Sequence, residues 1–349
     1  MKHICVLFAF LIVLLSCSLP ESVEMPDANL AAAVREALDL APNAPIMAED
    51  LKELGSLRAT SKGITNLTGL EKATGLTHLN LYGNKIVEIA PVAGLTQLKW
   101  LDLYGNRISD ITPLSELEQL EWLRLHSNQI RDITPLTKLK QLEVLGFSFN
   151  QISNIQPLAE LKQLKRLFIN NNQIVDITSL TGLIQLTHLG LSSNEITDIA
   201  PLTGLTLLTE LRLNKNEIRD TTPLSGLEDL RMLSLDDNEI ADITPLTELI
   251  QLRELYLARN QISHMPKSIE LMHLRLLNLQ ENQLNDITPL VGLTRLKSLN
   301  LWGNQIADTL PLARLPQSTD VWLEENQRNF LRKSGDSTEE IRPIHGLHE

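Results

Sequence analysis

The sequence predicts an α/β solenoid, in which one short strand per repeat joins a parallel sheet. Two observations support this fold class. Around a recurring asparagine runs one frame, seen over residues 98–114 as L-x-x-L-x-L-x-x-N-x-I-x-D-I-T-P-L. The asparagine returns every 22 residues, at Asn84, Asn106, Asn128, Asn150, Asn172, Asn194, Asn216, Asn238, Asn260, Asn282, Asn304 and Asn326. An unbroken period indicates one elongated core, which we expect over residues 54–326.

This frame is the leucine-rich repeat signature. Leu98, Leu101 and Leu103 alternate with other residues, so they should point inward from a short strand while the intervening side chains point outward. Successive strands would lie about 4.8 Å apart, and their outward positions would form the concave face. Pro113 and Pro135 block a regular strand or helix, which predicts turns and short 3₁₀ segments on the opposite, convex side.

Composition and charge narrow the function classes. The chain is 43% hydrophobic but only 4% aromatic, as expected for a core built from leucine and isoleucine. Its formal net charge is −12, and no run of basic residues occurs. Both features disfavour nucleic acid and anionic membrane surfaces as partners.

Residues 1–18 read as a signal peptide of the lipoprotein type. The apolar run from Ile4 to Leu15 is too short to span a bilayer, and Leu14-Leu15-Ser16-Cys17 resembles a bacterial lipoprotein box. We therefore expect Cys17 to be lipidated, with ordinary cleavage after Ser18 as the alternative. Either reading predicts export. The protein would lie at the outer membrane or cell surface as a lipoprotein, or otherwise be secreted or periplasmic, and would touch membrane only through this anchor.

The leader also holds both cysteines of the chain, Cys5 and Cys17. The mature protein should therefore contain neither a disulfide nor a thiol nucleophile, although export would permit disulfides.

A helical cap is expected over residues 23–53, before the repeats. Asp27 or Asn29 can accept hydrogen bonds from the first turn of a helix that begins near them, and a second short helix is expected over residues 47–54. Such a cap would cover the leucines that the end of a solenoid leaves open. A polar tail is expected over residues 327–349.

The cap opening Pro26-Asp27-Ala28-Asn29 and the recurring Asp-Ile-Thr-Pro-Leu resemble the internalin family of bacterial cell-surface proteins. The resemblance runs from about Met25 to Asn326. It implies a curved right-handed solenoid that binds proteins on its concave side. The repeat also resembles that of an intracellular regulatory subunit of protein phosphatases, which leaves a phosphatase-regulator-like scaffold as a distant alternative that the leader argues against.

The few aromatic residues indicate a binding surface. Every tryptophan and tyrosine falls at an outward strand position, and equivalent positions in adjacent repeats pair Trp100 with Trp122 and Tyr82 with Tyr104. Exposed aromatics beside arginine are typical of binding hot spots, whereas favourable cross-strand packing is the alternative explanation. The predicted ligand-binding residues of the concave face are His78, Asn80, Tyr82, Trp100, Asp102, Tyr104, Trp122, Arg124, His126, Phe168, Tyr256, Trp302 and Trp322.

Two polar columns have structural explanations. Each repeated asparagine should satisfy backbone groups where the strand leaves the sheet. The aspartates of the Asp-Ile-Thr-Pro segments, such as Asp110 and Asp132, should accept amides of their own turns. A calcium site is the alternative, but it needs six to eight converging oxygens, which one repeat does not supply. We therefore expect no metal and no cofactor.

The predicted function is non-enzymatic recognition of a protein ligand. Glycan recognition through the same face is the second candidate, with Trp100 and Trp122 stacking on sugar rings beside Asn80, Asp102 and Arg124. An enzyme is a distant third, because the sequence has no catalytic motif.

One repeat, residues 252–273, departs from the frame. Its segment Ile262–Ile269 replaces the usual Ile-x-Asp-Ile-Thr-Pro-Leu without changing the repeat length. We expect the stack to continue there with a locally different turn on the convex side.

Overall fold

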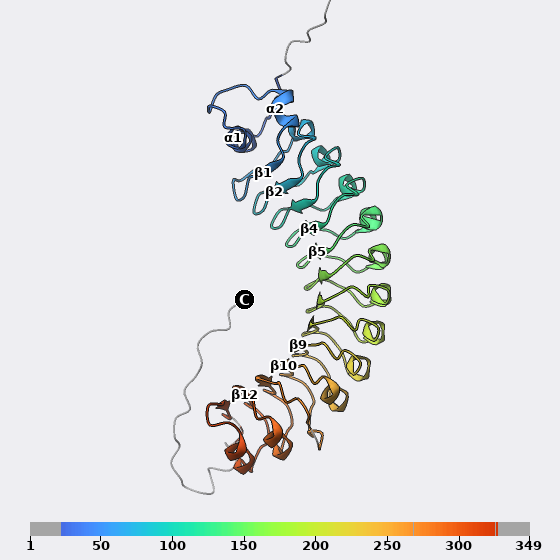
Figure 1. Cartoon of the computed structure of the whole chain (residues 1–349), viewed down its shortest axis with the longest axis vertical. Helices are drawn as coiled ribbons and strands as arrows, with labels where there is room; N and C mark the ends of the chain where they lie inside the picture. The colour runs from blue at the N-terminus through green and yellow to red at the C-terminus, as the bar shows by residue number, and fades with distance from the viewer. Residues whose placement is uncertain (1–21, 268, 325, 327–349) are drawn as a thin grey trace, which may run out of the picture.

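A single curved sheet organises the molecule. The structure, a computed structural model, describes residues 22–267, 269–324 and 326, so the predicted leader with Cys17 and the tail over 327–349 lie outside the described residues. Within the described part, thirteen parallel strands follow one another in chain order. Figure 1 shows the strands on the inside of an arc and short helical turns along its outside. The predicted leucine-rich repeat solenoid is therefore confirmed.

Each strand contains three residues, and a leucine stands at the centre of every strand but the last, which has Val321. Pairing is in register with the repeat, so that Leu79 lies beside Leu101 and Leu101 beside Leu123. The strands are β1 (Ser56–Arg58), β2 (His78–Asn80), β3 (Trp100–Asp102), β4 (Trp122–Arg124), β5 (Val144–Gly146), β6 (Arg166–Phe168), β7 (His188–Gly190), β8 (Glu210–Arg212), β9 (Met232–Ser234), β10 (Glu254–Tyr256), β11 (Leu276–Asn278), β12 (Ser298–Asn300) and β13 (Asp320–Trp322).

The core is a stack of leucine and isoleucine layers. Leu98, Leu101, Leu103 and Ile108 have no solvent exposure, and their equivalents in neighbouring repeats are buried in the same way. Burying one such side chain contributes roughly 1.5–3 kcal/mol, and each layer is shared with the repeats on both sides. The outward side chains of the strands are therefore carried on a rigid support.

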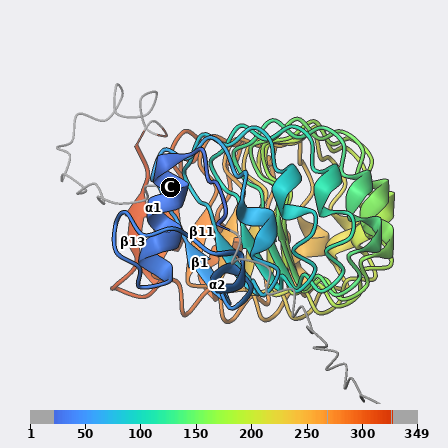
Figure 2. The same cartoon turned by 90° about the horizontal axis from the view of Figure 1, so that it is seen from above.

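Two helices cover the N-terminal end, α1 (Ala28–Ala37) and α2 (Ala48–Lys52). Figure 2, seen from above, shows both beside β1. Asp27 caps α1, since one carboxylate oxygen accepts from the amides of Asn29 and Leu30 at 3.0 and 3.1 Å. The other oxygen accepts from the Thr65 amide at 2.8 Å, which ties the cap to the first repeat. Within the described residues, no helix has the length and apolar character needed to cross a membrane.

The convex side consists of 3₁₀ segments, most of which carry proline in their first turn. These segments are η1 (Leu70–Lys72), η2 (Ala90–Val92), η3 (Thr112–Leu114), η4 (Thr134–Lys138), η5 (Gln156–Glu160), η6 (Thr178–Leu180), η7 (Ala200–Leu202), η8 (Thr222–Leu224), η9 (Thr244–Glu248), η10 (Thr288–Gly292) and η11 (Leu310–Arg314). The expected turns and 3₁₀ segments are confirmed.

The irregular repeat keeps its place in the sheet, as expected. β10 and β11 pair in the same register as the other strands. Among the described residues between these two strands there is no 3₁₀ segment. Met265, Pro266 and Ile269 instead line a small apolar cavity of about 20 Å³ under the convex surface. The irregular turn therefore packs less completely than the regular Asp-Ile-Thr-Pro turn.

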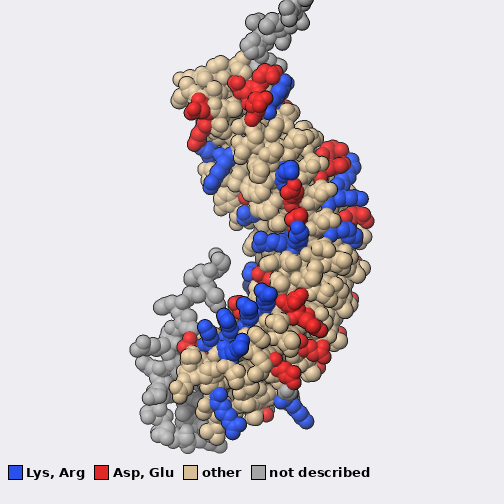
Figure 3. Space-filling view, viewed as in Figure 1, with Lys and Arg blue, Asp and Glu red and all other residues tan. Residues whose placement is uncertain are grey.

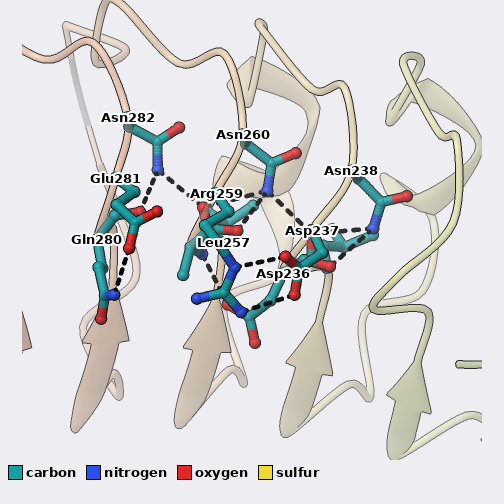
Figure 4. A network of polar contacts seen from close by, with 11 residues as sticks. Asp236, Asp237, Asn238, Leu257, Arg259, Asn260, Gln280, Glu281 and Asn282 are labelled. Carbon is teal, nitrogen blue, oxygen red and sulfur yellow. Dashed lines mark hydrogen bonds and ion pairs between the residues drawn. The ribbon is translucent and has the colours of Figure 1, made fainter. Parts of the chain in front are cut away.

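The repeated asparagines form a buried ladder, part of which Figure 4 shows. Asn260 is typical. Its Oδ1 accepts from the Ile240 amide at 3.0 Å, and its Nδ2 donates to the carbonyls of Leu235 and Leu257 at 2.9 and 3.1 Å. The predicted structural role of the asparagines is confirmed, because each one joins the backbone of its own repeat to the preceding one.

The aspartate column also has the predicted local role. The carboxylate of Asp110 accepts from the Thr112 amide at 2.8 Å, and Asp132, Asp220 and Asp286 make the same bond in their repeats. Hydrogen bonds from the side chain and the amide of Thr112 lower the pKa of Asp110. The described residues contain no group of three or more histidine, cysteine or acidic side chains placed to hold a metal ion.

Candidate functional site

The outward side chains of the strands stand in three rows that run along the concave face. The first row holds the first residue of each strand, such as Trp100, and the second holds the third residue, such as Asp102. The third row holds the residue two positions after the strand, such as Tyr104. Because register never changes, members of one row in adjacent repeats are direct neighbours.

Aromatic rings fill these rows over β2, β3 and β4. The rings of Trp100 and Trp122 stack with centroids 4.3 Å apart and planes 9° apart. In the third row the rings of Tyr82 and Tyr104 lie 5.0 Å apart at an angle of 38°. Both predicted neighbour pairs are confirmed. Such ring pairs contribute roughly 0.5–1.5 kcal/mol beyond the area that they bury.

Arg124 lies between the two ring pairs. Its guanidinium carbon is 5.3 Å from the centroid of the Tyr104 ring and 5.5 Å from that of Trp122, both within the range of a cation–π interaction. A guanidinium nitrogen is also 3.4 Å from the carboxylate of Asp102 on the preceding strand. These contacts fix the position of one positive charge among the rings.

Asp102 does not reach solvent as the sequence suggested, because only 3% of its surface is exposed. Its carboxylate accepts from the Tyr104 amide at 3.0 Å and faces Arg124. Burial raises the pKa of Asp102, against the opposing effects of the Tyr104 amide and Arg124. The buried carboxylate of Asp102 therefore holds the Arg124 side chain and the Tyr104 backbone in place.

His126 ends the third-row group. Its ring meets that of Tyr104 edge-on, with centroids 5.8 Å apart, and its Nδ1 accepts from the Ser148 amide at 2.9 Å. Burial and the nearby Arg124 charge lower the pKa of His126 to about 4. The imidazole is thus neutral at physiological pH, and its acceptor nitrogen is already used by the backbone.

Together Tyr82, Trp100, Tyr104, Trp122, Arg124 and His126 form what we call the N-terminal aromatic cluster. His78 and Asn80 border it on β2, where they pair with Trp100 and Asp102. Asn80 Oδ1 accepts from the Tyr82 amide at 3.0 Å. Nine of the thirteen residues predicted for the binding face therefore lie together near the N-terminal end of the array. They are His78, Asn80, Tyr82, Trp100, Asp102, Tyr104, Trp122, Arg124 and His126.

A hollow opens beside this cluster, next to the glycine that β5 carries in the second row. An added Cβ on Gly146 would lie only 2.2 Å from Nε2 of His126, so the histidine occupies the space that a side chain would need. The hollow has a volume of about 270 Å³ and is lined by Trp122, Arg124, His126, Val144, Gly146, Arg166 and Phe168. The predicted residue Phe168 forms its far wall, with the guanidinium carbon of Arg166 5.4 Å from the ring centroid.

Three features of this region were missed in the sequence, namely Gly146, Arg166 and Phe149. Phe149 is 58% exposed and has a φ of 60°, in the left-handed region that a bulky residue rarely adopts. Other repeats place glycine, serine, asparagine or a charged residue there. A glycine inside a strand and a phenylalanine before the ladder asparagine are sequence signals that would have identified two of them.

The remaining predicted residues lie in the C-terminal half and do not join the cluster. Tyr256 on β10 donates from its hydroxyl to Glu254 at 3.1 Å. Burial and the nearby Glu254 raise the pKa of Tyr256 to about 12. Trp302 lies two residues after β12, and Trp322 is the last residue of β13. Ring contacts between aromatic side chains in the described residues involve neither of them.

Asp236, the third-row residue after β9, is followed by a second acidic residue, Asp237 (Figure 4). Asp237 forms a bidentate ion pair with Arg259. Nε of Arg259 donates to one carboxylate oxygen of Asp237, and Nη2 donates to the other at 2.7 Å. Asp236 accepts from the Ala258 amide at 2.6 Å. Burial raises the pKa of Asp236 to about 6, although the Ala258 amide and Arg259 oppose this.

Comparison with known proteins agrees with the architecture. The family model "Leucine Rich repeats (2 copies)" matches residues 74–116, 96–138, 118–159, 140–182, 184–226 and 273–314. No curated protein matches the chain in sequence.

Solved structures give the more specific likeness. An internalin, InlF, from Listeria monocytogenes is 32% identical, with a TM-score of 0.81, over 88% of this chain and 98% of that one. Internalin C2 of the same species is 38% identical, with a TM-score of 0.59, over 60% of this chain and 93% of that one. The functional domain of InlJ, also from Listeria monocytogenes, shares the fold at 20% identity and a TM-score of 0.70, over 88% of this chain and 72% of that one.

Proposed function

Since the chain belongs to the internalin family of leucine-rich repeat proteins, we propose that it is a non-enzymatic protein that binds a protein ligand on its concave face. The observation that carries this proposal is the N-terminal aromatic cluster, where two ring pairs and one arginine share three adjacent strands. Tryptophan, tyrosine and arginine are the residues that dominate binding hot spots. Contiguous apolar patches are uncommon on soluble surfaces that bind nothing.

The cluster is preorganised for binding. Trp100 and Trp122 hold each other by stacking, and Arg124 is held by two rings and a buried carboxylate. Little side-chain entropy is therefore lost when a ligand covers them, and rigid anchors give more affinity for the same contact area. The leucine core underneath fixes the spacing of the anchors.

The hollow over Gly146 would receive one ligand side chain. Its walls combine the rings of Trp122 and Phe168 with the guanidinium groups of Arg124 and Arg166, while His126 is neutral. This lining suits a side chain with an apolar stem and an acidic or polar end. A volume near 270 Å³ has room for one such side chain beside the flat aromatic surface.

Glycan binding at the same cluster is the weaker candidate. A sugar stacks on the face of an aromatic ring, but Trp100 and Trp122 cover one face of each other at 4.3 Å. The stacked pair therefore leaves fewer free faces than two separate rings would. A protein ligand can use both edges and faces of the pair, which favours the protein reading here.

We further propose that the protein is exported and that Cys17 carries a lipid. The apolar leader with Ser16-Cys17 supports this proposal, and a surface location agrees with a binding role.

The test is capture of ligands by the wild-type protein beside Trp100→Ala and Trp122→Ala, with Trp302→Ala as the matched control. We expect the first two variants to lose a protein that the wild type and the control retain. A parallel glycan array would show no ligand that depends on Trp100. Retention of every captured protein by both cluster variants, or a glycan that needs Trp100, would contradict the proposal.

A further inference from the structure

A second charged feature lies at the other end of the solenoid. Arg231, Arg253, Arg275 and Lys297 each stand immediately before a strand, at the edge where β9 to β12 begin, and we call them the basic edge row. All four are exposed. The amide of Arg253 donates to the carbonyl of Arg231, Arg275 to Arg253 and Lys297 to Arg275, each at 2.8 Å. The backbones of neighbouring members of the row are therefore one strand spacing apart, about 4.8 Å.

The same row is neutralised in the N-terminal half. There Lys99 lies 3.2 Å from Glu121, and Lys165 lies 2.7 Å from Glu143, so that each lysine of the row has a glutamate partner on an adjacent strand. In the described part of the chain, no member of the basic edge row forms an ion pair. Like charges on adjacent strands are unfavourable. Four successive unpaired cations in a protein with net charge −12 thus indicate a bound anion rather than a stabilising arrangement.

The row ends in a polar hollow of about 330 Å³. Arg275, Arg295 and Lys297 line it, together with Thr294, Leu296, Pro316 and Ser318. Three cations around one hollow, with hydroxyl groups beside them, make a site for a sulfate or carboxylate group. Figure 3 shows lysine and arginine side chains gathered along the concave side of the C-terminal half.

The concave face next to the row carries tryptophan and amide side chains. Trp302 and Trp322 have no ring partner within the described residues, so their faces are not covered by another ring. Asn278 and Asn300 stand beside each other in the second row, and Gln280 accepts from Asn300 at 3.0 Å. Two carboxylates oppose the cations from the first row, namely Glu254, which accepts from Tyr256, and Asp320.

We propose that the C-terminal repeats bind a linear anionic polysaccharide, whose sulfate or carboxylate groups lie along the basic edge row. A sugar ring with its linkage is about as long as one strand spacing, so a polymer with one charge per ring matches the row. An extended peptide repeats the same side only every second residue, about 6.6 Å, and fits the spacing less well. The side-chain amides can form hydrogen bonds with sugar hydroxyl groups, and the free tryptophan faces can stack on sugar rings. An acidic peptide has neither the hydroxyl groups nor the sugar rings. This site is separate from the N-terminal aromatic cluster and does not depend on its function.

The probe is heparin, measured by titration against the whole mature protein at several salt concentrations. Arg275→Gln/Lys297→Gln removes two cations of the row. Lys85→Gln/Arg107→Gln is the matched control, because it removes two exposed cations outside the row and gives the same net charge. We expect the first double variant to weaken heparin binding roughly a hundredfold, because each charge-assisted hydrogen bond contributes about tenfold and two are lost. The slope of log Kd against log salt should fall by about two.

Further arms separate this proposal from its alternatives. Glu254→Gln should tighten heparin binding, because it removes a carboxylate beside the row. Trp302→Ala should weaken it, and Trp100→Ala should leave it unchanged, which keeps this test independent of the proposed protein ligand. Equal losses in the two double variants would mean that only net charge matters and would overturn the proposal. Polyglutamate or single-stranded DNA binding through the row more tightly than heparin would overturn the choice of a polysaccharide.

Discussion

Removal of one asparagine from the ladder should destabilise the array far more than its small side chain suggests. In Asn260→Ala the buried amide of Ile240 loses its acceptor, the Oδ1 atom at 3.0 Å. The carbonyls of Leu235 and Leu257 lose a donor but keep those of Asn238 and Asn282, at 3.0 and 2.9 Å. An orphaned buried donor costs about 1–3 kcal/mol, and two weakened acceptors add about 1 kcal/mol. The expected loss of unfolding free energy is therefore roughly 2–4 kcal/mol.

Asn260→Asp distinguishes the contribution of the accepting Oδ1 of Asn260 from that of its donating Nδ2. The carboxylate can still accept from Ile240, but its second oxygen replaces the Nδ2 that faces two carbonyls near 3 Å. This repulsion raises the pKa of the new carboxyl, so its penalty should be largest at neutral pH and should decrease as the pH falls and the group is protonated. Asn260→Asp should accordingly be less stable than Asn260→Ala at pH 7.

The assay is urea unfolding of both variants, together with hydrogen exchange of the Ile240 amide. Asn154→Ala is the matched control, because Asn154 is exposed and accepts only the Gln156 amide of its own turn, at 2.9 Å. It should cost about 1 kcal/mol or less. If Asn260→Ala cost no more than the control, or the Ile240 amide kept its protection, the asparagine ladder would not be a main support of the array.

Asp236, Gly146 and Cys17 are three further residues whose substitution has a defined expected effect. Asp236→Asn should stabilise the protein at pH 7.5 by about 1–3 kcal/mol, because the folded pKa of Asp236 is raised to about 6. This gain in unfolding free energy should disappear as the pH falls below the ordinary aspartate pKa near 3.8. Urea titrations that gave a gain independent of pH would contradict this prediction. Gly146→Ala should displace His126, break its bond to the Ser148 amide and cost about 1–3 kcal/mol, so unchanged thermal stability would show that the hollow is not shaped by this contact. Cys17→Ala should abolish labelling by a radioactive fatty acid and release the protein from the detergent phase, whereas labelling that persists would leave simple secretion.

The fold was predictable because every repeat carries the same pattern of core, turn and asparagine residues. Leu101 and its equivalents alternate with outward residues, so strand, register and convex turn follow from the sequence pattern alone. The ladder asparagine was predictable for the same reason. Even the irregular turn at Met265 and Pro266 kept its strand, since the repeat length was conserved.

The candidate site was predictable only in part. Which rings are neighbours follows from register, as for Trp100 and Trp122, but burial depends on what the neighbouring repeat carries. Asp102 is covered because Arg124 folds over it, and His126 leans into the space that Gly146 leaves empty. These are relations between side chains of different repeats, and no single repeat contains them. Likewise, the sequence shows the cations of the basic edge row but not that they are unpaired, because ion pairs depend on where the side chains lie.

The N-terminal aromatic cluster should bind the ligand, while the leucine core only supports the cluster. The most direct measurement is the dissociation constant of the captured protein ligand for wild type, Trp100→Ala and Trp122→Ala, with unfolding free energies measured in parallel. Each tryptophan variant should bind about thirtyfold more weakly, roughly 2 kcal/mol, with stability nearly unchanged. Leu101→Ala, one residue away but fully buried, should instead lose roughly 2–5 kcal/mol of stability. Wild-type affinity in both tryptophan variants would contradict the account and reduce the cluster to sheet packing.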